Sequence, residues 1–192
     1  MRLVVLGGPG AGRGTQCELL RRQFDMIWIS TGDILRRAIA AKDSDGDCQT
    51  ELGRQTHQYV EQGELVPDEL MIQFMRQRLL QPDVAKGWLL DGYPRTAFQA
   101  EELDFLLDEV NQQLDQAIYL EVPDDVLMQR SMARGRIDDQ PESVQRRIDL
   151  FRECTQPMLE YYELRDRLLR INGNQLIEQV QQEILKKLGV IV

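Results

Sequence analysis

The sequence predicts an α/β fold in which a doubly wound parallel sheet of five strands lies between helices. Short apolar runs alternate with longer stretches of helical periodicity along the 192 residues, and this alternation is typical of parallel sheets. The first apolar run stops at a glycine-rich loop that opens a helix. No internal repeat or low-complexity tract divides the chain, so we expect a single domain over residues 1–192.

The predicted strands are five short apolar runs. The first, LVVL at residues 3–6, is continuous and contains two β-branched residues, which is typical of a strand buried on both faces. The predicted strands are residues 3–6, 26–29, 88–90, 117–122 and 168–171. The predicted helices are residues 15–24, 31–41, 52–62, 68–80, 97–110, 124–133, 141–165 and 176–188.

Composition excludes several classes of protein. With 42% hydrophobic and 29% charged residues, a chain of this length can bury a core without disulfides or a structural metal. A net charge of -9 argues against a general binder of nucleic acid or of membrane surfaces, because such proteins carry a positive field. Cys17, Cys48 and Cys154 form no CxxC pair, so a reducing cytoplasm fits best. The apolar start is too short for a signal peptide or a membrane span.

The glycine-rich loop is the strongest functional signal. It follows a buried strand and opens a helix, and this context predicts a phosphate site formed by backbone N–H groups and the positive end of the helix. An ordinary strand-to-helix turn is the alternative, but the spacing, the basic residue and the hydroxyl all match the phosphate-binding pattern. The expected phosphate-binding residues are Gly10, Ala11, Gly12, Arg13, Gly14 and Thr15.

Arg13 departs from the general phosphate-loop pattern, which has lysine at this position. Lysine is a compact point charge that can follow a transferring phosphoryl group, whereas arginine is longer, planar and forked. We therefore expect nucleotide binding to tolerate this residue better than catalysis does.

Four motifs in order give a more specific resemblance. GGPGAGRGTQ begins at Gly7, STGDILR at Ser30, DGYPRTAFQ at Asp91 and RGRIDDQPESVQRR at Arg134. In order and spacing they resemble the adenylate kinases, over essentially the whole chain. The resemblance implies reversible, magnesium-dependent transfer of the terminal phosphoryl group from ATP to AMP, giving two ADP, in adenine nucleotide homeostasis. It also implies a monomer whose partners are ATP, AMP and ADP.

The resemblance assigns residues to the ATP side. It places the ATP phosphates on the glycine-rich loop, with Arg13 in the position of the lysine, and the adenine on the backbone of residues 173–175, including Gln175. Asp91, which ends an apolar strand, resembles the acid that orders magnesium through water. Arg130 and Arg134 resemble arginines at the hinge and in the lid, and Arg134 is assigned mainly to ATP.

A second set of residues resembles the AMP side. Arg95 is assigned to the AMP phosphate and Gln99 to the adenine edge, while Arg136 and Arg147 are assigned to AMP and the transferred phosphoryl group. The expected AMP-binding residues are Thr31, Arg36, Glu64, Leu65, Val66, Gly92, Arg95, Gln99, Arg136 and Arg147. The catalytic residues are expected to be Arg13, Arg95, Arg130, Arg134, Arg136 and Arg147.

The resemblance also divides the chain. The core is expected to comprise residues 1–30, 67–133 and 138–192, with a helical monophosphate-binding insertion at 31–66 and a vestigial lid at 134–137. A single glycine separates Arg134 from Arg136, so the lid is too short for the zinc site that some relatives carry. The polar stretch 42–50 has aspartates, but its glycine and final acid do not fit a calcium loop, so a solvated turn is expected.

The chemistry requires no general base. The phosphate of the acceptor has a second pKa of about 6 and is already mostly a dianion near neutrality, so positioning and charge stabilisation suffice. His57, on a polar helix, is accordingly expected at the surface. The predicted insertion and lid are expected to close over the substrates and exclude water.

Two alternatives stay open at this point. UMP/CMP kinases have similar motifs but typically carry alanine in place of Thr31 and asparagines near Thr96 and Gln99, so the sequence favours adenylate. Arg13 raises the other alternative, a nucleotide-binding protein with impaired turnover, because a misplaced charge-stabilising group costs a factor of about 100 or more.

Overall fold

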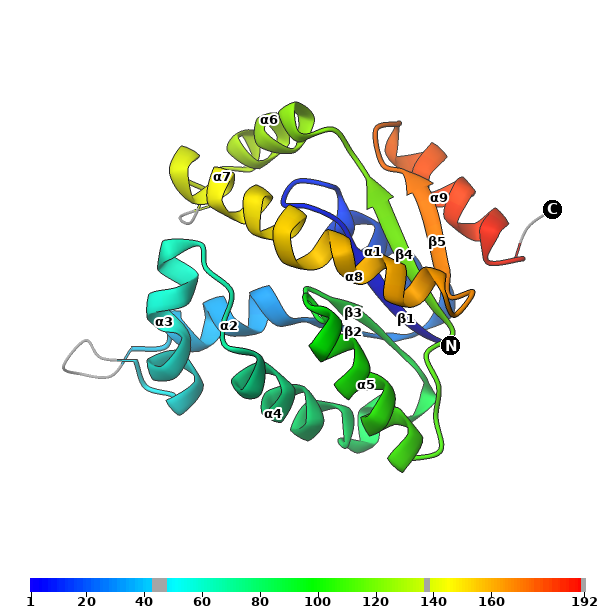
Figure 1. Cartoon of the computed structure of the whole chain (residues 1–192), viewed down its shortest axis with the longest axis horizontal. Coiled ribbons are helices and arrows are strands. Elements are labelled where there is room, and N and C mark those ends of the chain that lie inside the picture. The colour runs from blue at the N-terminus through cyan, green and yellow to red at the C-terminus, as the bar shows by residue number, and fades with distance from the viewer. Residues whose placement is uncertain (43–47, 137–138, 191–192) are drawn as a thin grey trace.

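A computed structural model describes residues 1–42, 48–136 and 139–190. Its centre is a sheet of five parallel strands in the order β2-β3-β1-β4-β5 (Figure 1). The strands are β1 (Arg2–Leu6), β2 (Ile27–Ser30), β3 (Trp88–Asp91), β4 (Gln116–Glu121) and β5 (Leu168–Asn172). The predicted fold class is confirmed.

Helices cover both faces of the sheet. They are α1 (Arg13–Phe24), α2 (Thr31–Ala40), α3 (Glu51–Gln62), α4 (Asp68–Leu79), α5 (Ala97–Glu109), α6 (Asp124–Arg134), α7 (Pro141–Leu150), α8 (Gln156–Glu163) and α9 (Ile177–Lys187). A 3-10 turn (Pro82–Lys86) precedes β3 and a π turn (Phe151–Thr155) joins α7 to α8. Helices α2 and α3 pack on each other to one side of the sheet (Figure 1).

The alternation of side chains along β1 creates two hydrophobic cores. Val4 and Leu6 belong to the core that also includes residues of α4, α5 and α8. Leu3 and Val5 point to the opposite face, where they join residues of α1, α7 and α9. Because both sets are fully or almost fully buried, residues 3–6 of the strand all need to be apolar, as the continuous LVVL run predicts.

The strand order places a crevice at the end of β1. β1 lies between β3 on one side and β4 on the other. The strand order reverses direction at this point, which makes it a topological switch point. The glycine-rich loop follows β1, and Asp91 ends β3 directly beside Val5 of β1. Ligands of open parallel sheets bind at such a switch point, outside the carboxyl ends of the strands.

Predicted and observed elements differ at a few ends. α1 begins at Arg13, two residues earlier than the pattern indicated. The stretch predicted as one helix, residues 141–165, contains the π turn and ends its last helical segment at Glu163. The predicted turn at 42–50 lies largely outside the described residues. Two of its residues that are described, Lys42 and Cys48, form an isolated antiparallel β-bridge. The last residue of the predicted lid, residue 137, also lies outside them.

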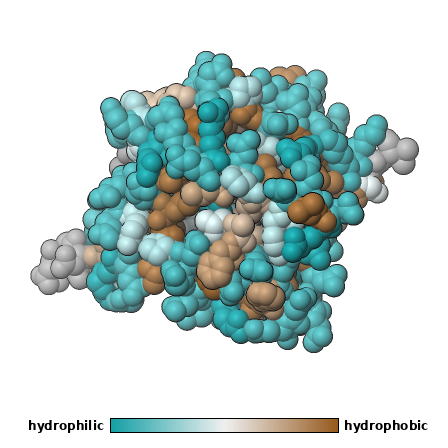
Figure 2. Space-filling view, viewed as in Figure 1, coloured by the Kyte–Doolittle hydropathy of each residue, from teal (hydrophilic) through white to brown (hydrophobic). Residues whose placement is uncertain are grey.

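The described surface matches the composition. Hydrophilic residues dominate the face drawn in Figure 2, and hydrophobic side chains gather toward the middle of the view. Within the described ranges, none of the helices has the length and apolar character needed to cross a membrane.

Candidate active site

Two adjoining cavities lie at the carboxyl ends of β1 and β3. The larger, of about 710 Å³, is lined by the glycine-rich loop, by Asp91 and by arginines from several elements. The smaller, of about 100 Å³, lies against α2, the end of α3 and the start of α5. Both are lined by Gly32, Arg36, Gly92, Arg95 and Arg147. The two cavities therefore meet at a set of shared arginines.

The sequence-predicted residues divide between these cavities. The larger is lined by Gly10, Ala11, Gly12, Arg13, Gly14, Thr15, Asp91, Arg130, Arg134, Arg136 and Gln175, in addition to shared residues. The smaller is lined by Thr31, Glu64, Leu65, Val66 and Gln99, again with shared residues. This grouping follows the expected ATP and AMP sides except at Arg136, which was expected on the AMP side and lines only the larger cavity. The role of each residue stays a prediction.

Close packing explains the glycines of the loop. Gly10 adopts a φ of 80°, and a Cβ built on it would lie 2.6 Å from the backbone oxygen of Leu127 and 2.8 Å from the hydroxyl of Ser131. A side chain at this position would require both the loop and α6 to move. Gly12, with a φ of 95°, is the residue that directly precedes α1. The loop thus passes close to α6 and directs the start of α1 toward the larger cavity.

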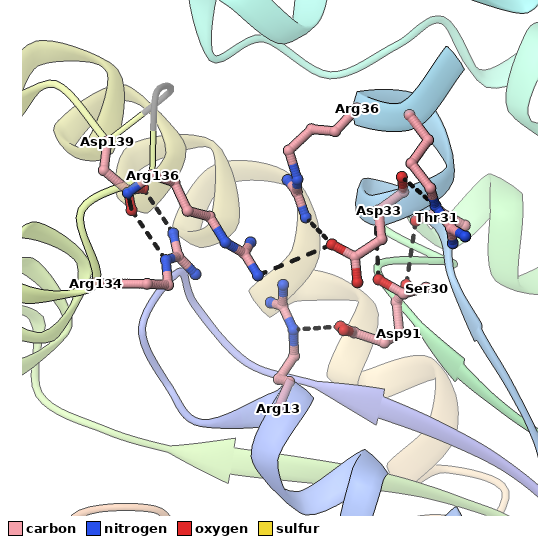
Figure 3. A network of polar contacts seen from close by, with 10 residues as sticks. Arg13, Ser30, Thr31, Asp33, Arg36, Asp91, Arg134, Arg136 and Asp139 are labelled. Atoms are coloured by element: carbon pink, nitrogen blue, oxygen red, sulfur yellow. Dashed lines mark hydrogen bonds and ion pairs between the residues drawn. The ribbon is translucent and has the colours of Figure 1, made fainter. Parts of the chain in front are cut away.

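Arg13 is held by the protein itself. Its Nε donates to Oδ1 of Asp91 at 2.8 Å, and its Nη1 donates to the carbonyl oxygens of Gly7 and, at 3.4 Å, of Gly8. The side chains of Arg13 and Asp91 are 20% and 12% exposed. As Figure 3 shows, the guanidinium lies beside Asp91 and points toward the region where other arginines converge. The residue that replaces the usual lysine therefore bridges the loop and the end of β3.

Arg95 is held differently, at the junction of the cavities. Its Nε donates to the carbonyl oxygen of Gly92 at 3.0 Å, and among the described residues no carboxylate forms an ion pair with it. Burial, followed by repulsion from Arg13, lowers the pKa of Arg95 to about 10. The group stays protonated near neutrality, but its charge is poorly compensated, so a phosphate beside it would be stabilised.

The end of β3 is tightly packed against α2. The hydroxyl of Thr31 donates to the backbone oxygen of Asp91 at 3.2 Å. Gly92 has a φ of 90°, and a Cβ on it would lie 2.5 Å from the Thr31 hydroxyl. On the same helix Asp33 accepts from Arg36, and although burial opposes it, the bond from Arg36 keeps the pKa of Asp33 below its ordinary value.

Asp139 organises the arginines near the predicted lid. Its side chain is fully buried. Arg134 donates to both of its oxygens at 2.9 and 2.6 Å, Arg147 donates at 2.8 Å, and the backbone N–H of Arg136 donates at 3.1 Å. Burial opposes ionisation, but these bonds hold the pKa of Asp139 well below its ordinary value. One carboxylate therefore bonds to three of the predicted phosphate-binding arginines: to the side chains of Arg134 and Arg147 and to the backbone of Arg136.

Arg130 and Gln175 lie at another wall of the larger cavity. Arg130 donates to the carbonyl oxygen of Gly173 at 3.0 Å and to Oδ1 of Asn174 at 3.4 Å. The amide nitrogen of Gln175 donates to the backbone oxygen of Asn172 and to Glu183. Both residues thus bond to the loop after β5, and Arg130 also lines the larger cavity, so its catalytic role stays a prediction.

Two contacts connect the predicted insertion to the predicted lid and α7. Nη2 of Arg136 lies 3.9 Å from Oδ1 of Asp33 (Figure 3). Arg146 on α7 donates through two nitrogens to the carboxylate of Glu64, at 2.8 and 3.2 Å. The segments that carry the predicted phosphate-binding arginines therefore contact each other at two points.

Sequence reasoning missed three acids of this site. Asp139 fixes the lid arginines, Asp33 joins Arg36 to Arg136, and Asp68 bonds to Gln99. Asp33 and Asp139 fall inside quoted motifs, and their only signal was the density of arginine around them. Asp68 lies about thirty positions from its partner, so no local pattern indicates the contact.

The one histidine lies outside both cavity linings. His57, 38% exposed, contacts Glu61 four residues along α3, in agreement with the expected surface position. Among the residues that the structure describes, no group of three or more His, Cys, Asp or Glu side chains could hold a metal ion.

Comparisons with known proteins agree with this geometry. The family model described as "Adenylate kinase" matches residues 5–167. The chain is 55% identical to "Adenylate kinase 2" of Nostoc sp. over 190 residues, covering 99% of this chain and 100% of the relative. It is 48% identical to "Adenylate kinase 2" of Synechocystis sp. over 188 residues, covering 98% and 100%. It is also 37% identical to "Adenylate kinase" of Caldicellulosiruptor saccharolyticus, covering 99% and 100%.

Proposed function

Because the chain belongs to the adenylate kinase family, we propose that its larger cavity binds the ATP phosphates and its smaller cavity binds AMP. The enzyme transfers the terminal phosphoryl group of ATP to AMP reversibly, giving two ADP. The single observation that supports a nucleotide in each cavity is the set of arginines that line both cavities where they meet. Phosphoryl transfer needs the two phosphates to meet at a point of concentrated positive charge.

On the donor side, the backbone N–H groups of the loop and the start of α1 bind the β- and γ-phosphates. Arg13 supplies the charge that lysine supplies in the general pattern. Its Nη1 already lies against the loop carbonyls, so a short movement of the side chain brings the guanidinium to a phosphate in the cradle. Arg134, held by Asp139, stabilises the donor phosphates from the opposite side.

On the acceptor side, Arg36 and Arg95 bind the AMP phosphate, with Arg95 at the shared junction. The Thr31 hydroxyl and the backbone of Gly92 shape the wall behind it. The base lies between Gln99 and the segment containing Glu64, Leu65 and Val66. Arg136 and Arg147 approach from the lid and α7 and stabilise the charge of the phosphoryl group as it moves.

Adenylate kinases generally use Mg²⁺ with ATP, and the donor set here fits that ion. Asp91 and Thr15 supply hard oxygen donors at the wall of the larger cavity, and Mg²⁺ is typically bound by one or two carboxylates while it keeps several waters. Asp91 would hold it through water. When bound, the ion neutralises charge on the donor phosphates and keeps them in line.

The segments 31–66 and 134–137 form the monophosphate-binding insertion and the short lid of this proposal. Both carry phosphate-binding arginines outside the core sheet, so closing them over the substrates would exclude water and prevent hydrolysis of ATP. The same proposal places the protein in the cytoplasm as a monomer. Distances between α3 and α6 measured by fluorescence transfer should shorten on adding a bisubstrate dinucleotide, and unchanged distances would contradict closure.

A coupled assay of ADP formation tests the function directly. ATP is supplied with AMP, CMP, UMP or GMP in parallel, with and without magnesium. We expect AMP to be the preferred acceptor and magnesium to be required. Nothing in the comparisons favours the UMP/CMP alternative or the impaired binding protein, and preference for CMP or UMP would overturn the assignment of the acceptor cavity.

A further inference from the structure

The amide of Gln99 is fixed at both ends inside the acceptor cavity. Gln99 is 2% exposed and lines this cavity. Its amide nitrogen Nε2 donates to Oδ1 of Asp68 at 2.7 Å, and its amide oxygen Oε1 accepts from the backbone N–H of Arg95 at 2.8 Å. The second oxygen of Asp68 accepts from the hydroxyl of Thr96 at 3.1 Å. Asp68 and the backbone thus determine how this amide lies.

These partners leave only one orientation for the amide. The two ends of a glutamine amide have nearly the same shape, so their assignment rests on the hydrogen-bond network. A carboxylate only accepts and a backbone N–H only donates. Rotating the Gln99 amide by half a turn would place its oxygen against the Asp68 carboxylate and its NH₂ group against the Arg95 N–H. Both contacts would be repulsive.

The remaining bonding capacity of the amide matches one kind of base. After these two bonds, Gln99 keeps one N–H donor and one oxygen lone pair. The edge of a 6-aminopurine offers N1 as an acceptor and the 6-amino group as a donor, so it can bond to both. A 6-oxopurine offers an N1–H donor and an oxygen acceptor, the reverse pattern, which only the rotated amide could bond.

We propose that Asp68 is a specificity-determining positioning residue that locks the Gln99 amide to accept 6-aminopurine monophosphates and to reject 6-oxopurine monophosphates. This inference rests on the proposed assignment of the smaller cavity to AMP. Asp68 does not touch the nucleotide in this proposal. A 6-oxopurine requires the rotated orientation of the Gln99 amide, and Asp68 makes that orientation unfavourable. The enzyme thus discriminates by weakening the binding of the wrong ligand.

Asp68 also has a structural effect that is distinct from orienting Gln99. Asp68 and Glu69 are both in the first turn of α4, where a negative charge also stabilises the helix. Glu69 is exposed, and no hydrogen bond joins it to Gln99 among the described contacts. Glu69→Gln therefore removes the same charge from the same helix turn without changing the amide, and it is the matched control for Asp68→Asn.

The test compares AMP with inosine monophosphate, which differs from AMP only at N1 and the 6-position. For the parent, Asp68→Asn, Asp68→Ser and Glu69→Gln, kcat/KM for both acceptors is measured with MgATP. Dissociation constants for both monophosphates are measured by calorimetry. Serine suits the start of a helix but is too short to hold the amide. Circular dichroism and the affinity for ATP verify that each variant keeps the parent fold and donor site.

We expect the parent to prefer AMP by a factor of about 100 or more, because the reversed pattern leaves two buried polar groups unpaired. Asp68→Asn can donate to a rotated Gln99, so its preference should fall by about tenfold or more, with the affinity for ATP unchanged. Glu69→Gln should keep the parent ratio within about twofold. If the ratio of kcat/KM for AMP to kcat/KM for inosine monophosphate stays at the parent value in both Asp68 variants, the proposal is overturned. An equal fall of this ratio in Glu69→Gln would overturn it as well. A parent enzyme that does not prefer AMP would instead contradict the proposed function.

Discussion

The proposed donor and acceptor halves of the cleft hold their central arginines in opposite ways. On the donor side, Arg13 is paired with Asp91 and with carbonyl oxygens of its own loop. On the acceptor side, Arg95 bonds to the Gly92 carbonyl, has no carboxylate partner among the described residues, and has its pKa lowered to about 10 by burial and by repulsion from Arg13. In the proposed complex, a donor phosphate would thus compete with Asp91 for Arg13, whereas an acceptor phosphate would compensate a charge that the protein leaves uncompensated.

This difference predicts which half of the cleft depends more strongly on a single arginine. A cation with uncompensated charge in a partly buried site interacts more strongly with an arriving dianion than a cation that is already paired. The acceptor half should therefore be sensitive to the loss of one arginine. The donor half should tolerate more, because backbone N–H groups and the start of α1 share the work of binding phosphate.

Replacing Arg95 should have the largest effect. We expect Arg95→Gln to lower kcat/KM for AMP by about 10³, since removing one preorganised charge-stabilising group beside the reacting phosphates costs up to this much. KM for ATP should change by less than about threefold, because the donor cradle is separate. Steady-state kinetics with each substrate varied in turn measure both values. Arg76→Gln, at an exposed arginine on α4, is the control and should keep both values near the parent. A rise in KM for ATP as large as the loss for AMP would remove the distinction between the halves.

Replacing Asp139 should have the next largest effect, and it should act on both halves. Asp139→Asn weakens the bonds that hold Arg134 and Arg147, so we expect kcat to fall by about 100-fold. Since the carboxylate is buried and paired, the free energy of unfolding should fall by about 3 kcal/mol. Urea titration of parent and variant measures this change. Glu142→Gln, an exposed acid on α7, should leave both quantities near the parent values.

The stability difference caused by Asp139 should also depend on pH. The folded-state pKa of Asp139 lies well below the ordinary value, because the bonds from Arg134 and Arg147 outweigh burial. Such a group contributes its full stability above the ordinary pKa of about 3.9, and the contribution declines as pH falls toward the folded-state value. Urea titrations at pH 7 and pH 3 should show a smaller gap between parent and Asp139→Asn at pH 3. A gap that widens on acidification would contradict the assigned ion pairs.

The sequence predicts the donor half better than the contacts that tune either half. The LVVL run predicts a strand buried on both faces, and the glycine spacing predicts the loop that follows it, because both depend on local steric requirements. The partners of Arg13, Gln99 and Arg147 could not be predicted, because Asp91, Asp68 and Asp139 reach them only through tertiary packing. The π turn between α7 and α8 could not be predicted for a different reason, because its residues continue a helical pattern.

Substitution of Arg13 tests the donor half with a smaller expected change. Lysine keeps the charge that the loop requires, so we expect Arg13→Lys to alter kcat by no more than about tenfold, whereas Arg13→Ala should lower it by about 100-fold. Rates measured at saturating ATP and AMP, with dissociation constants for ATP, separate turnover from binding. A much larger gain in turnover for Arg13→Lys, with unchanged affinity, would show that arginine at this position limits the enzyme.

The contact between the insertion and α7 should show the smallest effect. Arg146 and Glu64 form two bonds, but their side chains are 44% and 34% exposed, and exposed ion pairs contribute only about 0.2–1 kcal/mol. We therefore expect Glu64→Gln to raise KM for AMP by less than about threefold and to leave kcat near the parent value. Repeating the measurement at high salt should reduce the difference further, because exposed charges are screened. A loss comparable to that of Arg95→Gln would mean that the closure of the insertion, and not the buried arginine, determines acceptor binding.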